Sequence, residues 1–217
     1  PLTRRSLFTG AAAGLAALGV AADSSSAAQA QLVWKGSQWK LADFQKLVAH
    51  SASVKQVYDV TQVSEGRCLN SIKNSLNGLH FGFDVPEAQI KIVAGLHGPA
   101  NLLNYNDSIW SKCKIGEWLN VVDPATGKPA ERNIFYSSRH SVDAAALAAD
   151  PDDRDSVYQE TAIQTLQARG VQFLSCHTAL EEQARILVRR NQLTQTPEDL
   201  VKDMMANAMP GVLSVAS

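Results

Sequence analysis

The stretch Gly170-Val171-Gln172-Phe173-Leu174-Ser175-Cys176-His177-Thr178-Ala179-Leu180-Glu181-Glu182 joins two elements of different periodicity. Its apolar run at Val171, Phe173 and Leu174 predicts a short buried strand. Thr178 and Glu181 have the Thr-x-x-Glu spacing of a capping box, which predicts a helix that begins there. Cys176 is therefore expected in the turn between the carboxyl end of a strand and the amino end of a helix.

This placement matters because a helix amino terminus carries partial positive charge, which favours a thiolate over a thiol. In open α/β sheets, ligands also bind at the carboxyl edge of the strands. The alternative is a small buried cysteine that merely completes the strand. We favour a functional thiol at Cys176 because strand end and helix start coincide there.

The composition fits one domain with a sizeable core, since the chain has 217 residues. Its 20 Lys and Arg balance 21 Asp and Glu, and the basic residues are scattered, so no nucleic-acid partner is expected. The three cysteines form no disulfide framework. The absence of a Cys-x-x-Cys pair argues against structural zinc, and we expect neither a metal nor a cofactor.

Residues 1–30 are predicted to be a targeting segment. Thr3-Arg4-Arg5-Ser6-Leu7-Phe8 resembles the twin-arginine export motif, and a weakly hydrophobic Ala/Gly/Leu stretch follows it. Ala28-Gln29-Ala30 fits the small-x-small rule for cleavage, while an uncleaved anchor is the alternative. The expectation is export by the twin-arginine translocase to the periplasm.

The rest of the chain alternates predicted strands and helices. An arm and helix at 31–53 precede a single α/β domain at 54–217, with strands expected at 54–60, 90–96, 171–174 and 211–216. This order implies right-handed crossovers, hence a mostly parallel sheet in a three-layer α/β/α fold. Ser64 and Thr196 are expected to be the N-caps of helices, and Pro99 is expected in the first turn of another.

Two segments have a less regular pattern. Leu41, Phe44, Leu47 and Val48 form a helical stripe that is expected to pack on the domain. Residues 114–155 form a long insertion, in which 118–122 and 133–136 pair as a hairpin around Asp123-Pro124-Ala125-Thr126-Gly127 or belong to a loop layer. We read the Asp150-Pro151-Asp152-Asp153 run as a solvated helix start rather than a metal site.

The strand ends after Val60, Leu96 and Leu174 are expected at one edge of the sheet, forming a crevice. Candidate catalytic residues there are Cys176 and His97, because an imidazole beside such a thiol supports the thiolate. Cys113, near the far end of its helix, is read as structural, and Cys68 either faces Cys176 or is buried. The candidate binding residues around them are Gly98, Asn101, His177, Thr178, Ser64 and Cys68.

A family resemblance rests on three motifs in this order. They are His97-Gly98-Pro99-Ala100 after the second strand, Gly170-Val171-x-Phe173-Leu174-x-Cys176, and Met209-Pro210-Gly211-Val212. Over roughly residues 54–217 the chain resembles the DsrE/DsrF-like family. The resemblance implies a parallel sheet between helix layers, a trimer or hexamer, and sulfur relay through a persulfide. It also implies that Cys176 is the sulfur acceptor and that His97 belongs to the same pocket.

Three hypotheses follow for the function. The first is an exported sulfur transferase or persulfide carrier that exchanges sulfane sulfur with a small sulfur compound or a partner protein. The second is a non-catalytic ligand-binding or assembly protein whose insertion at 114–155 forms an oligomer interface. The third, a hydrolase that uses Cys176 and His97, lacks an evident third group to orient the imidazole.

Overall fold

The computed structural model describes residues 39–216. The predicted signal peptide at 1–30 and the first part of the predicted arm at 31–53 lie outside these residues. Within them, no helix is both long enough and apolar enough to cross a bilayer.

A four-stranded parallel sheet forms the centre of the fold, as the sequence predicts. Its strands are β1 (Val54–Val60), β2 (Ile90–Leu96), β5 (Gln172–Cys176) and β6 (Leu213–Val215), in the order β1-β2-β5-β6. The α/β fold class is therefore confirmed. The bounds of β1 and β2 match the prediction. β2 is a mainly apolar run and β1 mixes Val and Tyr with polar residues, and both are bounded by polar or turn-forming residues.

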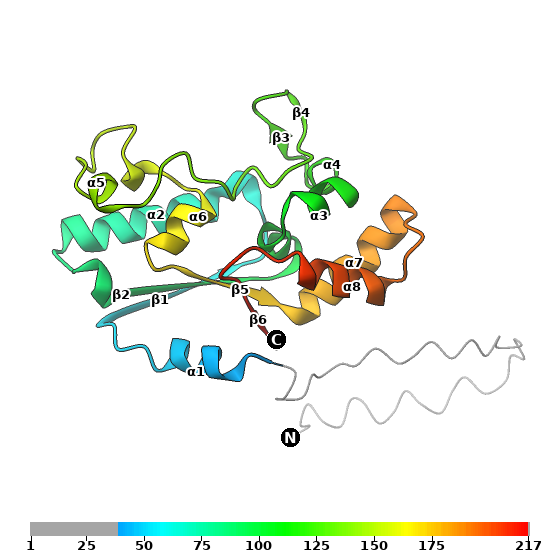
Figure 1. Ribbon diagram of the computed structural model, residues 1–217, viewed down its shortest axis with the longest axis horizontal. Coiled ribbons are helices and arrows are strands. Elements are labelled where there is room, and N and C mark those ends of the chain that lie inside the picture. The colour runs from blue at the N-terminus through cyan, green and yellow to red at the C-terminus, as the bar shows by residue number, and fades with distance from the viewer. Residues whose placement is uncertain (1–38, 217) are drawn as a thin grey trace, which may run out of the picture. The chain divides into compact units, whose positions relative to one another are not determined.

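Helices cover the sheet unequally (Figure 1). In that view β1, β2 and β5 run from left to right, α2 and α6 lie above them, α1 lies below, and α7 and α8 lie beyond the carboxyl end of β5. The helices are α1 (Leu41–Val48), α2 (Arg67–Asn77), α3 (Asp107–Lys112), α4 (Ile115–Leu119), α5 (Ala144–Leu147), α6 (Ile163–Ala168), α7 (His177–Asn191) and α8 (Pro197–Ala206). Short 3-10 turns occupy Ser64–Gly66, Glu87–Gln89, Gly98–Asn104 and Val157–Gln159, and a π turn occupies Gly78–Gly82.

The face of the sheet below α2 and α6 holds the core. Alternate residues of β2 point to this face and are buried, which is the period-2 pattern of a strand packed on one side. They meet the apolar stripe of α2 and the inner side of α6. The buried residues of this contact are Ile90, Ile92, Ala94, Leu96, Leu69, Ile72, Leu76 and Leu166.

The opposite face is much less covered at β1. We call the side chains Lys55, Val57 and Asp59 the open face, since all three are exposed along the strand. Helix α1 lies on this side of the sheet but contacts β6, at the other edge. Side chains of β1 therefore face solvent where a second helix layer would otherwise cover them.

This placement overturns the expectation that α1 packs its apolar stripe on the domain. None of its residues is buried, and Leu41, Phe44 and Val48 are 48%, 40% and 64% exposed. The helix forms where the period predicts it, and it meets the sheet near β6. Helical periodicity identifies an apolar face without specifying what covers it.

The structure confirms one of the helix caps predicted from sequence and contradicts another. Thr196 caps α8 as predicted, since its Oγ1 accepts the N–H of Asp199 at 3.1 Å. Ser64 is not an N-cap, because it has φ 43° in a 3-10 turn and α2 begins after Gly66. Gly66 has φ 77°, a conformation that glycine adopts readily.

The insertion at 114–155 is mainly a loop layer with one small hairpin. That hairpin pairs β3 (Val122–Asp123) with β4 (Lys128–Pro129), so its turn lies where the sequence predicts it. The strands are shorter than predicted, and the second lies at 128–129 rather than at 133–136. Trp118 lies in α4 instead. The Nδ2 of Asn133 donates to the carbonyls of Leu103 and Tyr105, both at 2.9 Å, which holds the layer to the domain.

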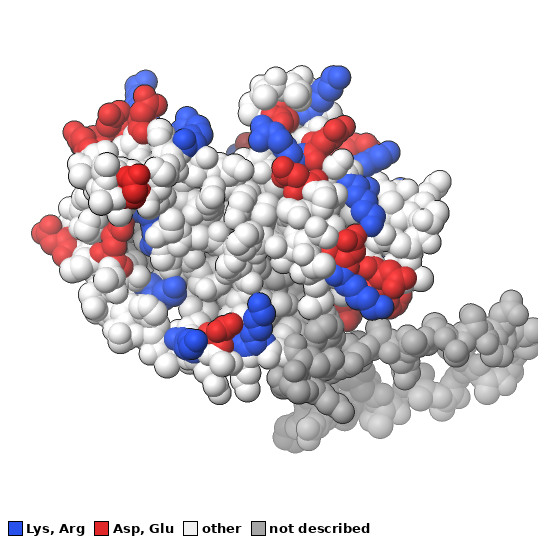
Figure 2. All heavy atoms as spheres, in the orientation of Figure 1, with Lys and Arg blue, Asp and Glu red and all other residues white. Residues whose placement is uncertain are grey.

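The acidic run at 150–153 begins no helix. Two of its carboxylates accept the backbone N–H two residues further along the chain. Asp152 N–H donates to Asp150 Oδ1 at 2.9 Å, and Asp155 N–H donates to Asp153 Oδ1 at 3.0 Å. These are turns of the Asx type, which compete with helix formation. On the face drawn in Figure 2, acidic and basic side chains are interspersed and no basic patch gathers.

Candidate functional site

Cys176 ends β5 and is the N-cap of α7. Its Sγ accepts the N–H of Ala179 at 3.2 Å, at the amino terminus of a helix of 15 residues. The capping box predicted at Thr178 is therefore wrong, and Thr178 lies inside the first turn. The strand passes into the helix without a loop, so the last strand residue takes the capping position. Cys176 is 5% exposed.

A buried polar network fixes the backbone under the cysteine. The Nδ2 of Asn101 donates to the carbonyl of Cys176 at 3.3 Å, and Ser175 Oγ donates to Asn101 Oδ1 at 3.0 Å. Tyr105 contacts Ser175 Oγ at 3.1 Å, and burial raises the pKa of Tyr105 to about 12. The phenol therefore stays neutral. The structure thus brings Asn101 and Cys176 together, as predicted.

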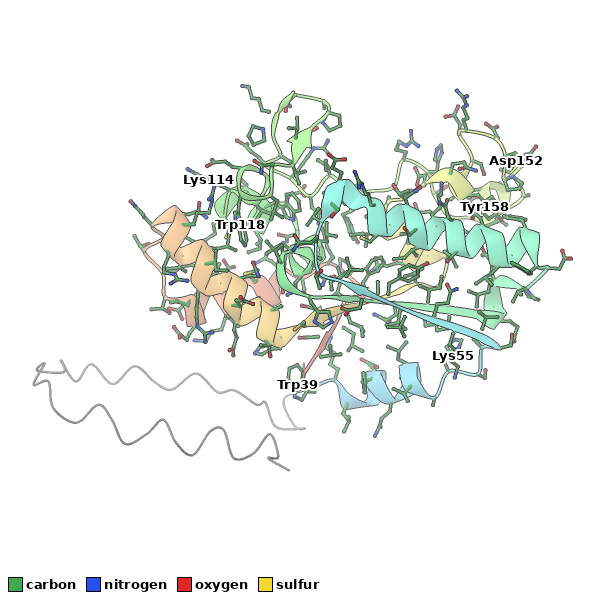
Figure 3. The ribbon with its side chains drawn as sticks, turned by 180° about the vertical axis from the view of Figure 1, so that it is seen from behind. Trp39, Lys55, Lys114, Trp118, Asp152 and Tyr158 are labelled. Carbon is green, nitrogen blue, oxygen red and sulfur yellow. The ribbon has the colours of Figure 1, made fainter. Side chains whose placement is uncertain are left out.

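His177 lies beside the cysteine in a largely buried position. Its Nε2 is 3.4 Å from Glu181 Oε1, and its ring meets Trp39 edge to face at a centroid distance of 5.4 Å. Burial lowers the pKa of His177, and the nearby Glu181 carboxylate only partly offsets that effect. The imidazole is thus biased towards its neutral form, which can accept a proton. Figure 3 labels Trp39 just before α1.

His97 follows β2 directly and turns towards β1. Its Nε2 lies 3.5 Å from Asp59 Oδ1, and a Cβ added at Gly95 would lie 3.4 Å from the same nitrogen. The imidazole therefore folds back over Gly95. Gly98 follows with φ 47°, which lets the chain turn into its 3-10 helix.

His97 and Cys176 occupy neighbouring positions at the carboxyl edge. Leu96 pairs with Ser175 in the parallel register, so the next residue of each strand is His97 and Cys176. Their contacts differ, because the imidazole pairs with Asp59 and the thiol accepts from Ala179. Asp59 is the third group that the sequence did not reveal. The sequence could have revealed it, because aligning the ends of the two predicted strands puts Asp59 of β1 beside Gly95 of β2.

Ser64 and Cys68 belong to a different part of the edge. They follow β1, and the strand order places β2 between β1 and β5. Cys68 is half-buried in α2, forms no disulfide with Cys176, and burial raises the pKa of its thiol. The structure therefore does not gather these two residues around Cys176.

Cys113 directly follows α3, and its carbonyl accepts from the Nδ2 of Asn191, at the end of α7, at 2.7 Å. It is fully buried at the end of α3, and burial raises the pKa of its thiol to about 11. A thiol with a raised pKa has little thiolate at neutral pH. Cys68 and Cys113 are thus both poor nucleophiles.

A cavity of about 360 Å³ adjoins the polar network under Cys176. Its lining includes Trp39, Tyr105, Ser175, Met205 and Ser214. This is a volume that suits a small molecule. Across residues 39–216, His, Cys, Asp and Glu side chains form no group of three that could hold a metal ion.

The fold and site define an α/β protein with a cysteine at the junction of a parallel strand and a helix. Comparison with known proteins finds no matching family model, no matching curated protein and no matching solved structure.

Proposed function

We propose that this protein carries sulfane sulfur on Cys176 as a persulfide. The observation that carries the proposal is the hydrogen bond from Ala179 N to Cys176 Sγ at the amino terminus of α7. Backbone N–H groups and the helix dipole stabilise negative charge on sulfur at this position. The resemblance to the DsrE/DsrF-like family supports the same residue.

The reaction is a thiol exchange that needs only a persulfide donor, R–S–SH. The Cys176 thiolate attacks the outer sulfur, a new S–S bond forms, and the donor's S–S bond breaks. R–S⁻ leaves with the electron pair of that bond, and Cys176–S–SH remains. In the second step an acceptor thiolate attacks the outer sulfur of Cys176–S–SH, which restores the Cys176 thiolate.

The side chains around the cysteine suit this exchange. His177, the next residue in the chain, is biased towards its neutral form, which is the form that can accept a proton. The buried network of Asn101, Ser175 and Tyr105 holds the backbone of Cys176. Because Cys176 is only 5% exposed, small donors should load it faster than bulky ones.

A hydrolase would need a third group to orient the imidazole of His97, and Asp59 is such a group. Its contact with His97 forms a histidine–carboxylate pair that is separate from Cys176. Asp59 is 77% exposed at its side chain, and it draws the His97 imidazole towards β1. A hydrolase needs that imidazole on the nucleophile. We therefore assign His97 to the rim of the site.

A second candidate is a non-catalytic small-molecule binding protein. The cavity of about 360 Å³ favours it, because three hydroxyl-bearing residues, Tyr105, Ser175 and Ser214, line it together with apolar side chains. In this case the thiol of Cys176 is only a helix cap. Export to the periplasm and self-assembly fit both candidates.

The test is loading with a small-molecule persulfide, followed by peptide mass mapping. Wild type, Cys68→Ser and Cys113→Ser should gain one sulfur atom on the peptide that contains Cys176. Cys176→Ser should gain none, and an acceptor thiol should remove the sulfur from the other three proteins. Equal loading of Cys68 or Cys113 would contradict the proposal. No loading at all would leave the binding protein as the account to pursue.

A further inference from the structure

Strand β1 is an outer strand of the sheet with one edge open. In the order β1-β2-β5-β6, it pairs with β2 alone among the strands of residues 39–216. An outer strand presents a row of backbone N–H and C=O groups that another strand can pair with. Figure 3 shows β1, with Lys55 labelled near its start, lying between α2 on one side of the sheet and α1 on the other.

The open face of β1 combines an exposed apolar residue with two opposite charges. Val57 is 76% exposed at the middle of the strand. Lys55 and Asp59 are exposed two residues before and two residues after it. Successive residues of a strand alternate between faces, so these three side chains share one face.

The sequence of β1 is self-complementary about Val57. If the strand is reversed and laid beside itself, Lys55 stands opposite Asp59, Gln56 opposite Tyr58, and Val54 opposite Val60. Val57 then stands opposite itself on the axis. Opposite charges and apolar pairs directly across an antiparallel ladder stabilise it, whereas like charges weaken it.

We infer that β1 pairs antiparallel with β1 of a second copy of this chain, about a two-fold axis through Val57. Such an interface uses the same patch on both copies, so each favourable pair occurs twice. It joins the two parallel sheets into one continuous sheet and covers both copies of Val57. The inference is independent of the sulfur chemistry proposed for Cys176.

Other registers lose these matches. An axis at Gln56 sets Lys55 against Val57, and an axis at Tyr58 sets Asp59 against Val57. Each also leaves residues of the seven-residue strand without a partner. Only the axis at the central residue pairs the whole strand and both charges.

The helix beside the outer edge carries one exposed charged residue, Arg67 at its start. The hydroxyl of Tyr58, on the other face of β1, contacts Ser75 Oγ at 2.6 Å and the carbonyl of Ser71 at 3.3 Å. Both serines are small, and the exposed Asn70 and Asn74 on α2 are uncharged. In an antiparallel pair the two α2 helices run in opposite directions, so the two copies of Arg67 lie at opposite ends of the interface.

Charge reversal on the full chain tests the pairing by sedimentation velocity. Lys55→Asp and Asp59→Lys each set like charges across the axis twice, so each should weaken dimerisation by about tenfold or more. The double variant Lys55→Asp/Asp59→Lys restores opposite charges and should dimerise like wild type. Lys46→Asp, on exposed α1, is the matched control and should leave dimerisation unchanged.

Cysteine cross-linking tests the register on a Cys176→Ser background. Val57→Cys should form a disulfide-linked dimer on mild oxidation, because residues opposite each other lie about 4.5–5.5 Å apart at Cα. Lys55→Cys should not, because its two copies are about 13 Å apart in this register. A monomeric wild type, a double variant that stays monomeric, or a Lys55→Cys dimer would overturn the inference. Circular dichroism of each variant checks that it has folded.

Discussion

Substitution of Cys176 separates its capping role from its chemistry. Cys176→Ala removes the acceptor for Ala179 N, and loss of an N-cap costs about 1 kcal/mol of unfolding free energy. For a chain of this size that is about 2–4 °C in Tm. Cys176→Ser keeps an acceptor, since serine is a preferred N-cap, so its stability should lie within about 0.5 kcal/mol of wild type.

Cys113 provides the matched control, because it is buried without capping a helix start. At Cys113 the order of the two substitutions should reverse, so that Ser destabilises the protein more than Ala. Cys113→Ser buries a hydroxyl in apolar surroundings, which costs more than the shorter side chain of Cys113→Ala. The assay is urea unfolding of all four variants at neutral pH under reducing conditions. If Ser is the more damaging substitution at both positions, the sulfur of Cys176 does not cap α7 and the electrostatic argument for its reactivity fails.

Three further predictions concern other parts of the chain. Because the pKa of His177 is lowered from 6.5 in the folded protein, the unfolded chain binds its proton first, so stability should fall as pH drops below about 6.5. His177→Asn should flatten that fall in urea titrations at pH about 7.5 and 5.5; an unchanged slope would refute this. Gly116→Ala should cost about 1–3 kcal/mol because its Cβ meets the backbone of Ala130, whereas Gly82→Ala has open space and should be nearly neutral. Replacing Arg4 and Arg5 by Lys should leave the precursor in the cytoplasm, and normal periplasmic yield of that variant would remove the export hypothesis.

The strands were predictable because their signal is local. β1 and β2 are apolar or alternating runs with clear ends, and the structure gives them the predicted bounds. The strand period also puts Val57 on the same face of β1 as Lys55 and Asp59, but sequence alone does not say whether a helix covers that face. What covers an apolar side chain depends on elements distant in the chain.

Helix starts were harder, because several residues compete for one cap. Thr178 and Glu181 have the right spacing, yet α7 begins earlier and Cys176 caps it. Glu181 contacts His177 and Arg185 instead. The spacing of Thr178 and Glu181 does not show where the strand ends. Because β5 ends at Cys176 and α7 follows directly, Cys176 takes the capping position.

The site was predictable where it lies on adjacent strands. β2 and β5 are neighbours, so the segments after them meet, and Asn101 holds the carbonyl of Cys176. Ser64 and Cys68 do not join them because β1 is one strand further away. Asp59 was missed because its partner His97 lies on another strand and the contact exists only across the sheet.

The most direct test of the account is the mass of the purified wild-type protein after brief exposure to a small persulfide, measured before and after reductant. The account predicts one added sulfur atom, located on the peptide that contains Cys176 and lost on reduction. An unchanged mass, or sulfur on Cys68 or Cys113 instead, would contradict the claim that Cys176 carries sulfur.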